Sequence, residues 1–235
     1  MFTLKICLVT DRRRLAPRDT QLDASCRCLV AQAHHAADAG IDIIQVRERD
    51  LEAAALASLV ADLLAVTSGT ATRVVVNDRL DIALACAADG VHLRGDSIAV
   101  EAARRLAPPG FLIGRSVHSV ADAAQTVGAD YVIAGTVFPS ASKRAAQTLL
   151  GLDGLRAIVA GVGVPVLAIG GINEDRVEAV AAAGAGGVAA IGVFMTPEPV
   201  GGDIDRSSCR AVPLVGVVER IRARFDRARR GSLIT

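Results

Sequence analysis

The chain has 235 residues, of which 51% are hydrophobic and only 3% aromatic, and its formal net charge is +1. This length fits one α/β barrel with a core of Ala, Val, Ile and Leu, and the near-neutral charge argues against a nucleic-acid or anionic-membrane partner. The five cysteines are odd in number and have no C-x-x-C pair, which argues against a disulfide framework or a zinc site.

Neither a membrane-spanning helix nor a secretory signal is predicted. The most apolar stretch, residues 157–172, is interrupted by glycines and by Pro165, which a spanning helix of about 20 residues does not favour. Residues 4–9 already have the pattern of a strand, so the charged, apolar and small-residue regions of a secretory signal are missing. We therefore expect a cytoplasmic protein without a membrane partner.

Short β-branched runs alternate along the chain with longer Ala-rich segments of helical period. Eight runs are predicted as strands, at residues 4–9, 41–47, 73–77, 90–93, 111–116, 131–135, 165–169 and 187–191. The alternation predicts a (β/α)8 TIM barrel that spans residues 1–235 as one domain, with an irregular insertion at about 196–213 before the final helix. An open doubly wound sheet is the alternative, but it gives no reason for eight evenly spaced units.

A weak internal repeat supports closure into a barrel. Similar segments occur at residues 39–42, 87–90, 128–130 and 184–186, a spacing of roughly 40 to 55 residues. Each is predicted to end a helix and enter an even-numbered strand. Gly40, Gly128 and Gly184 suit a left-handed helix cap that turns the chain sharply back into the sheet.

Cationic side chains follow the predicted strands at the end where barrels place functional residues. Gln45, Arg47 and Arg49 alternate by strand period, which predicts that they point the same way and that the two arginines meet an anion. Lys143, in the long segment after the sixth strand, is a third candidate cation. For each of these residues alone, a solvated surface charge is the alternative.

The third predicted strand ends in Asn77 and Asp78, a pair of oxygen ligands. Mg²⁺ is commonly bound by one or two carboxylates together with substrate phosphates, so the pair predicts a magnesium site that faces a diphosphate. Asp78 also immediately precedes a predicted helix, and a helix cap explains it as well.

Glycines follow the last two predicted strands. Gly170 and Gly171 lie after a buried strand, with Asn173 ready to cap the next helix, and Gly192 follows the eighth strand. Backbone N–H groups at such glycines can approach an anion closely, and barrels of this type often bind phosphate after strands seven and eight. Tight turns explain either glycine site alone, whereas the two together favour a phosphate site.

His118 lies just past the fifth predicted strand, between Val117 and Ser119. Because the pKa of a free histidine lies near neutrality, His118 is a candidate proton shuttle, and a neighbour of a helix cap without a catalytic role is the alternative. His34 and His35 lie in a predicted helix and are expected to be structural or solvent-facing, and His92, on the fourth strand, is expected to be a packed residue rather than a ligand.

The order and spacing of these motifs resemble the thiamine phosphate synthase and TenI superfamily. The similarity extends from Leu8 to Gly192, and its most specific parts are Leu8-Val9-Thr10-Asp11, Gln45-Val46-Arg47-Glu48-Arg49, Asn77-Asp78-Arg79-Leu80-Asp81, Ala88-Asp89-Gly90-Val91-His92-Leu93, Ser116-Val117-His118-Ser119, Phe138-Pro139 with Lys143, and Ile169-Gly170-Gly171-Ile172. The synthases join hydroxymethylpyrimidine diphosphate to thiazole phosphate and release pyrophosphate. The resemblance therefore implies a transferase with two small phosphorylated substrates.

The resemblance also implies a role for each matched position. The pyrimidine diphosphate would be held by Gln45, Arg47, Arg49, Asn77, Ser116 and Lys143, and the thiazole phosphate by Ser140, Ser142, Gly171, Ile191 and Gly192. Asp78 would hold Mg²⁺. The family typically has Lys at the position of Arg49 and threonines at those of Ser140 and Ser142.

One departure from the family falls on the metal site. After the His-Leu of the fourth strand the synthases usually run Gly-Gln-x-Asp, with the final Asp as the second magnesium ligand, whereas this chain reads Arg94-Gly95-Asp96-Ser97. We expect Asp96 to serve as the ligand if the loop shifts by one residue, or Arg94 to supply part of the positive charge. The TenI-type thiazole tautomerases, which lack this carboxylate and use a histidine at position 118, are the alternative.

A tautomerase requires only one phosphate site and a proton shuttle, whereas this chain has a full set of residues for a second, more highly charged anion. The set favours the synthase, and it consists of Arg47, Arg49, Asn77, Asp78 and Lys143. A non-catalytic binder of phosphorylated ligands is a third alternative. Lys143 argues against the binder, because it lies in a long loop that is expected to close over the site. A protein that only binds its ligand has little use for such a closing loop. The sequence leaves open the oligomeric state and the role of the insertion.

Overall fold

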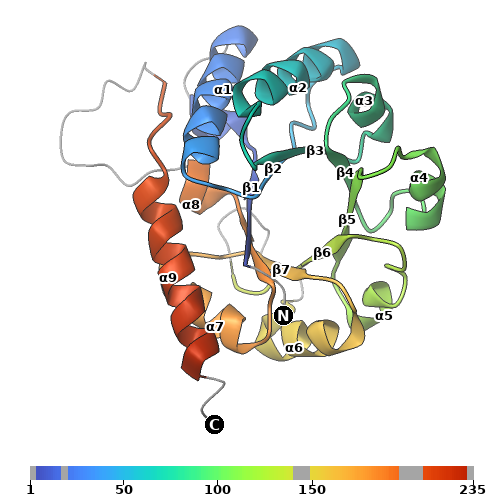
Figure 1. Cartoon of the computed structure of the whole chain (residues 1–235), viewed down its shortest axis with the longest axis vertical. Helices are drawn as coiled ribbons and strands as arrows, with labels where there is room; N and C mark the ends of the chain where they lie inside the picture. The colour runs from blue at the N-terminus through green and yellow to red at the C-terminus, as the bar shows by residue number, and fades with distance from the viewer. Residues whose placement is uncertain (1–3, 17–20, 140–148, 196–208, 232–235) are drawn as a thin grey trace.

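The computed structural model describes residues 4–16, 21–139, 149–195 and 209–231. Eight parallel strands are hydrogen-bonded in chain order, and β1 also pairs with β8, so the sheet closes into a barrel (Figure 1). The strands are β1 (Lys5–Val9), β2 (Ile43–Val46), β3 (Arg73–Asn77), β4 (Gly90–Leu93), β5 (Leu112–Val117), β6 (Tyr131–Ala134), β7 (Val166–Ile169) and β8 (Gly187–Ala190). The TIM-barrel prediction is confirmed, and every predicted strand overlaps an observed one.

Helices surround the ring of strands, as Figure 1 shows. They are α1 (Leu22–Asp38), α2 (Ala53–Thr67), α3 (Leu80–Ala85), α4 (Val100–Leu106), α5 (Val120–Ala123), α6 (Gly151–Gly161), α7 (Val177–Ala182), α8 (Gly192–Met195) and α9 (Val215–Gly231), with short 3-10 helices η1 (Arg12–Arg14) and η2 (Glu174–Arg176). The terminal helix α9 packs against α7 and α1. Within the described residues, no helix is long and apolar enough to cross a membrane.

The core has two layers, which follow from the alternation of side chains along each strand. Outward-facing side chains such as Ile44, Val76 and Val91 pack against the helices in the larger layer. The apolar side chains that face into the barrel are Cys7, Val9, Ile43, Val75, Tyr131, Ile133, Leu167 and Ala189. Because this inner layer is closed by apolar side chains, a ligand can enter only above it, at the carboxyl ends of the strands.

The internal repeat closes the opposite end of the barrel, where the strands begin. Gly40, Gly128 and Gly184 have the predicted positive φ angles of 74°, 85° and 86°, and Ala87 takes the same conformation at 51° without a glycine. The aspartate two residues farther along accepts a backbone N–H from the preceding strand in three of the four repeats. The pairs are Asp42 with Ile6 at 2.9 Å, Asp89 with Val74 at 2.8 Å and Asp130 with Ile113 at 2.6 Å.

In the fourth repeat the equivalent position is Gly186, where a Cβ atom would lie 3.2 Å from the Pro165 side chain. In three repeats the carboxylate thus accepts the N–H of the second residue of an odd-numbered strand, and in the fourth Pro165 crowds the space that such a side chain would occupy.

Candidate functional site

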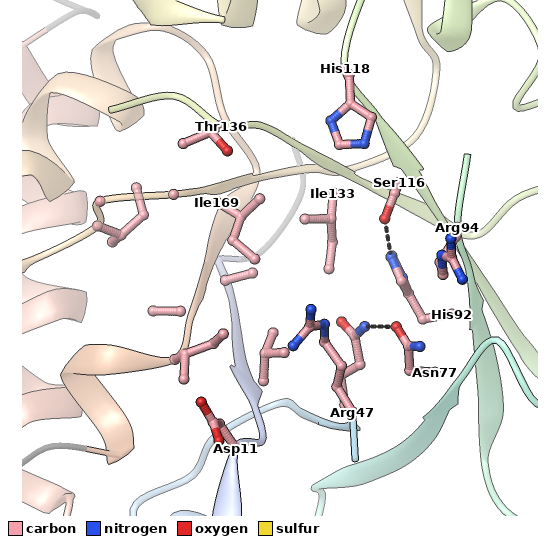
Figure 2. A pocket seen from close by; sticks show the side chains of 18 of the residues that line it. Asp11, Arg47, Asn77, His92, Arg94, Ser116, His118, Ile133, Thr136 and Ile169 are labelled. Atoms are coloured by element: carbon pink, nitrogen blue, oxygen red, sulfur yellow. Dashed lines mark hydrogen bonds between the residues drawn. The ribbon is translucent and has the colours of Figure 1, made fainter. Parts of the chain in front are cut away.

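A cavity of about 1060 Å³ opens at the carboxyl ends of the strands (Figure 2). The residues singled out from the sequence that line this cavity include Gln45, Arg47, Arg49, Asn77, Arg94, Asp96, Ser116, His118, Gly170, Gly171, Ile191 and Gly192. Asp78 lines a smaller adjoining cavity of about 200 Å³ together with Arg49 and Arg94. Ser140, Ser142, Lys143 and most of the insertion at 196–213 lie outside the described residues.

A buried amide pair forms part of the cavity wall. The side-chain nitrogen of Gln45 donates to Oδ1 of Asn77 at 2.9 Å, and both residues are buried. The other end of the Gln45 amide, Oε1, is buried without a hydrogen-bond partner among the described residues. Because an unpaired buried carbonyl oxygen costs free energy, this atom favours a ligand that brings an N–H or O–H donor.

His92, predicted to be a packed residue, is buried, but its contacts below the cavity were not predicted. Its Nε2 lies 2.9 Å from the Ser116 hydroxyl, and its Nδ1 lies 3.3 Å from the Tyr131 hydroxyl (Figure 2). Burial, reinforced by the charge of Arg115, lowers the pKa of His92 to about 3, so the ring is neutral near pH 7. Gly114 leaves room for the two rings, because a Cβ there would lie 2.2 Å from Tyr131.

His92 therefore orients Ser116 rather than carrying charge into the cavity. The signal that would have found it is register: Gly90 and His92 alternate along β4, so the imidazole points into the barrel as Asn77 does on β3, its partner in the ladder.

Arg47 and Arg49 extend toward the cavity from the end of β2, and Glu48 between them turns into the protein. The Arg12 guanidinium binds the Glu48 carboxylate at 2.8 Å and also pairs with Asp50, while Thr10 accepts the Arg47 backbone N–H at 2.8 Å. This buried network fixes the segment that carries the two cations.

Three carboxylates near Arg47 and Arg49 are paired with other arginines. Glu48 and Asp50 pair with Arg12, and Asp11 pairs with Arg14 at 3.0 Å. Within the described part of the chain, Arg47 and Arg49 have no ion-pair partner. Burial and the neighbouring charge of Arg49 lower the pKa of Arg47, which means that the charged form of Arg47 is held at an unfavourable position.

The predicted metal ligands occupy a tight polar turn. The Ser97 hydroxyl donates to Oδ1 of Asp78, and the Arg94 guanidinium lies 3.4 Å from Oδ2 of Asp78 and 2.6 Å from the Asp96 carboxylate. Asp78 does not cap α3, since Arg79 holds the N-cap position. The alternative interpretation of Asp78 as a helix cap is therefore wrong.

His118 stands at the mouth of the cavity, exposed to solvent (Figure 2). Its Nδ1 is hydrogen-bonded to the backbone carbonyl of Gly135, and its own backbone N–H donates to Asp122 at 2.8 Å. Because a carbonyl oxygen only accepts, Nδ1 carries the proton, and Nε2 of the neutral ring keeps a lone pair. That arrangement suits a proton acceptor, and it serves equally to anchor the turn after β5.

The glycines after β7 let the backbone approach closely. Gly170 and Gly171 have φ angles of 97° and 61°, and a Cβ on Gly171 would lie 2.4 Å from the Pro139 carbonyl oxygen. A Cβ on Gly192 would meet nothing within 4 Å, so its side faces open space. Asn173 accepts the Arg176 backbone N–H at 3.1 Å, which confirms its predicted capping role.

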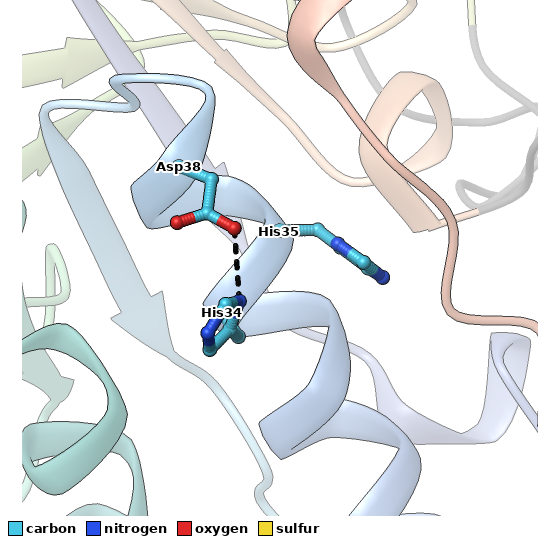
Figure 3. Close-up of side chains that lie close together, drawn as sticks. All are labelled: His34, His35 and Asp38. Carbon is cyan, nitrogen blue, oxygen red and sulfur yellow. Dashed lines mark ion pairs between the residues drawn. The ribbon is translucent and has the colours of Figure 1, made fainter.

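A separate cluster of His34, His35 and Asp38 lies at the last turn of α1, outside the barrel (Figure 3). His34 pairs with Asp38 at 3.0 Å across one helical turn. Since α1 runs antiparallel to the strands, this turn lies at the end of the barrel where strands begin. None of the three lines the rim cavity, and they take no part in the site.

Comparisons with known proteins agree with the geometry. A family model described as thiamine monophosphate synthase matches residues 16–194. A thiamine-phosphate synthase of Methanoregula boonei is 47% identical over 161 residues, which is 68% of this chain and 74% of the relative. Another, from Pyrococcus horikoshii, is 37% identical over 199 residues, 84% of this chain and 89% of the relative.

Solved structures give the same result. A thiamine phosphate pyrophosphorylase from Pyrococcus furiosus superposes with a TM-score of 0.74 at 32% identity and covers 96% of both chains. A 3-hexulose-6-phosphate synthase, at 19% identity and a TM-score of 0.61, shares the fold alone. With its family model matched over most of its length, the chain belongs to the thiamine monophosphate synthase family.

Proposed function

We propose that the chain is a thiamine-phosphate synthase that joins hydroxymethylpyrimidine diphosphate to thiazole phosphate and releases diphosphate. The observation that carries the proposal is one cavity with two different anion-binding walls: unpaired cations after β2 and glycine backbone after β7 and β8. The names of relatives at 37–47% identity support it.

On the cationic wall, we assign the diphosphate to Arg47 and Arg49, with Lys143, whose position lies outside the described residues, as a third cation. The unpaired Oε1 of Gln45 supports a pyrimidine amino group as its partner. Asn77 holds the Gln45 amide in place, and Ser116 offers its hydroxyl to the same ring from β5.

On the opposite wall, we assign the thiazole phosphate to the backbone N–H groups of Gly171 and Gly192, with Ile191 packed beside them. Gly192 begins α8, so its N–H lacks an acceptor within the helix. Ser140 and Ser142 would add hydroxyl donors, although neither lies within the described residues. A monophosphate requires fewer positive charges than a diphosphate, which agrees with a wall built from amides.

The chemistry follows from these two placements. The bond between the pyrimidine methylene carbon and the diphosphate oxygen breaks, and its electron pair leaves with the diphosphate. The thiazole nitrogen donates its lone pair to the resulting carbocation and forms the new C–N bond, so no proton has to move. Cations at the leaving group stabilise the developing charge, and the glycine wall holds the nucleophile in line.

Mg²⁺ is implied as a cofactor by the resemblance to the synthases, but the side chains present do not form an open ligand pair for it. Both oxygens of Asp78 contact protein groups, and the Asp96 carboxylate is paired with Arg94. No step of the proposed reaction is therefore assigned to a metal ion held by these carboxylates.

The decisive experiment incubates the protein with pyrimidine diphosphate and each thiazole phosphate tautomer, and scores thiamine phosphate and isomerised thiazole separately. The proposal predicts thiamine phosphate with equal release of diphosphate. The His118→Ala variant is expected to retain coupling within about tenfold, because leaving-group departure needs no proton shuttle.

The alternatives give different results in the same assay. Isomerisation without coupling, lost by about 10² or more in His118→Ala, would establish the tautomerase instead. Binding of both substrates without any product would establish the non-catalytic binder.

A further inference from the structure

The guanidinium of Arg94 lies between two carboxylates at the junction of the two rim cavities. One of its nitrogens is 2.6 Å from Asp96, and another is 3.4 Å from Asp78. Arg94 lines both the main cavity and the smaller one, and its side chain remains 39% exposed. Some N–H groups of the guanidinium therefore bind Asp78 and Asp96, and the rest of the group is open to the cavity.

Local backbone geometry holds this arrangement in place. Asp78 has a positive φ of 65°, and its backbone N–H donates to the His92 carbonyl at 2.9 Å, which aims the carboxylate at the turn after β4. Ser97 closes that turn: its hydroxyl accepts the Arg94 backbone N–H at 2.8 Å, and its own N–H donates to the Arg94 carbonyl at 3.2 Å.

This donor set differs from what Mg²⁺ requires. Magnesium needs near-octahedral oxygen ligands at about 2.0–2.1 Å and usually keeps several waters. Here Oδ1 of Asp78 accepts the Ser97 hydroxyl proton, and Oδ2 faces a positive group. A serine hydroxyl also brings no negative charge. The cationic position beside Asp78 is already filled by a side chain of the protein.

We propose that Arg94 supplies, as a fixed charge, the cation that contacts the substrate's diphosphate, in place of a magnesium ion held by protein carboxylates. This inference rests on the proposed function. Arginine is charged at every physiological pH, and its five donors allow it to bind carboxylate and phosphate at once. The charge of Arg94 also contributes to lowering the pKa of Arg47, so the arginines share one electrostatic environment.

Positions on neighbouring strand ends support the assignment. Arg47 follows β2, Asn77 ends β3 and Arg94 follows β4, and all three line the main cavity (Figure 2). A diphosphate between Arg47 and Arg94 would lie beside Asn77, next to the amide pair assigned to the pyrimidine. The leaving group would then sit between fixed cations on two sides.

The first test measures binding of inorganic diphosphate by calorimetry in EDTA, which requires no turnover. The wild-type chain is expected to bind without added metal, and Arg94→Gln to bind about tenfold more weakly or worse, as the loss of a charged hydrogen bond predicts. Arg94→Lys should recover part of the affinity. Arg105→Gln, on the exposed side of α4, is the matched control and should bind like wild type. Equal affinity of Arg94→Gln and wild type would overturn the proposal.

The second test titrates Mg²⁺ against thiamine phosphate formation. Wild type should keep most of its activity in EDTA, whereas the double variant Arg94→Gly with Ser97→Asp, which recreates a carboxylate pair, should require Mg²⁺. A wild-type enzyme that is active only with Mg²⁺ would contradict the inference. Absence of product at every Mg²⁺ concentration would refute the proposed function, while the calorimetric test would still decide the role of Arg94.

Discussion

Charged side chains are paired at one end of this barrel, whereas two arginines at the other end have no ion-pair partner among the described residues. At the end where strands begin, each aspartate of the internal repeat has both a backbone N–H donor and a basic partner: Asp42 pairs with Lys5, Asp89 with Arg73 and Asp130 with Arg104. At the rim, Arg47 and Arg49 point into the cavity, and the nearby carboxylates are paired with other arginines.

The difference separates folding from function within one framework. The hydrogen bonds and ion pairs of these aspartates are satisfied within the protein, so they contribute to the free energy of unfolding. Arg47 and Arg49 have no ion-pair partner among the described residues, and in the proposed function that partner is a substrate anion. This division agrees with the general behaviour of TIM barrels, in which the carboxyl ends of strands carry the active site.

The largest effect is expected for Arg47→Ala. We expect kcat/KM for thiamine phosphate formation to fall by about 10²-fold or more, because a preorganised charge at the leaving group is lost. The free energy of unfolding should not fall, since burial and Arg49 already make the charge unfavourable. Urea unfolding together with steady-state kinetics checks both parts. An equal loss of stability and activity would make Arg47 a structural residue.

A second substitution distinguishes the two glycines of the opposite wall. Gly171→Ala places a Cβ 2.4 Å from the Pro139 carbonyl at a positive φ, so we expect lower stability as well as a KM for thiazole phosphate raised by about tenfold or more. Gly192→Ala has open space around it, so stability should be unchanged while the same KM rises.

Gly161→Ala at the end of α6 is the control for the glycine pair, because its Cβ also meets nothing within 4 Å and it lies outside the cavity. It should change neither stability nor KM appreciably. An unchanged KM in Gly192→Ala would remove the thiazole phosphate from that wall.

At the end of the barrel where the strands begin, Asp89→Ala removes the acceptor of the Val74 N–H and the ion-pair partner of Arg73. We expect a loss of about 1–3 kcal/mol in the free energy of unfolding, with kcat/KM unchanged at a temperature where the variant is folded. Asp81→Ala, which breaks the exposed pair with Arg79, serves as the comparison and should cost about 0–1 kcal/mol. A kinetic defect in Asp89→Ala would mean that the two ends are coupled.

Much of the fold was predictable because local patterns and global topology agree. The strands are short and β-branched, the helices between them are Ala-rich, and the turn glycines Gly40, Gly128 and Gly184 take the predicted backbone conformation. The predicted strand ends differ by up to two residues, as at residue 41, where pairing in the sheet starts only at Ile43.

The candidate site was predictable to the same extent that it depends on topology. Gln45, Asn77 and Ser116 meet because the carboxyl ends of neighbouring parallel strands lie at one edge. Two individual side-chain contacts were not predictable. The pairing of Arg94 with Asp78 depends on the turn closed by Ser97, and the contact between His92 and Ser116 depends on the space left by Gly114.

In the proposed function, one cavity holds a diphosphate on its arginine wall and a monophosphate on its glycine wall. A crystal structure of the protein with thiamine phosphate and diphosphate would test this placement. We expect diphosphate oxygens within about 3.2 Å of the guanidinium groups of Arg47 and Arg94, and the product's phosphate at the same distance from the N–H groups of Gly171 and Gly192. Diphosphate on the glycine wall, or amides of Gly171 and Gly192 bonded within the protein, would contradict it.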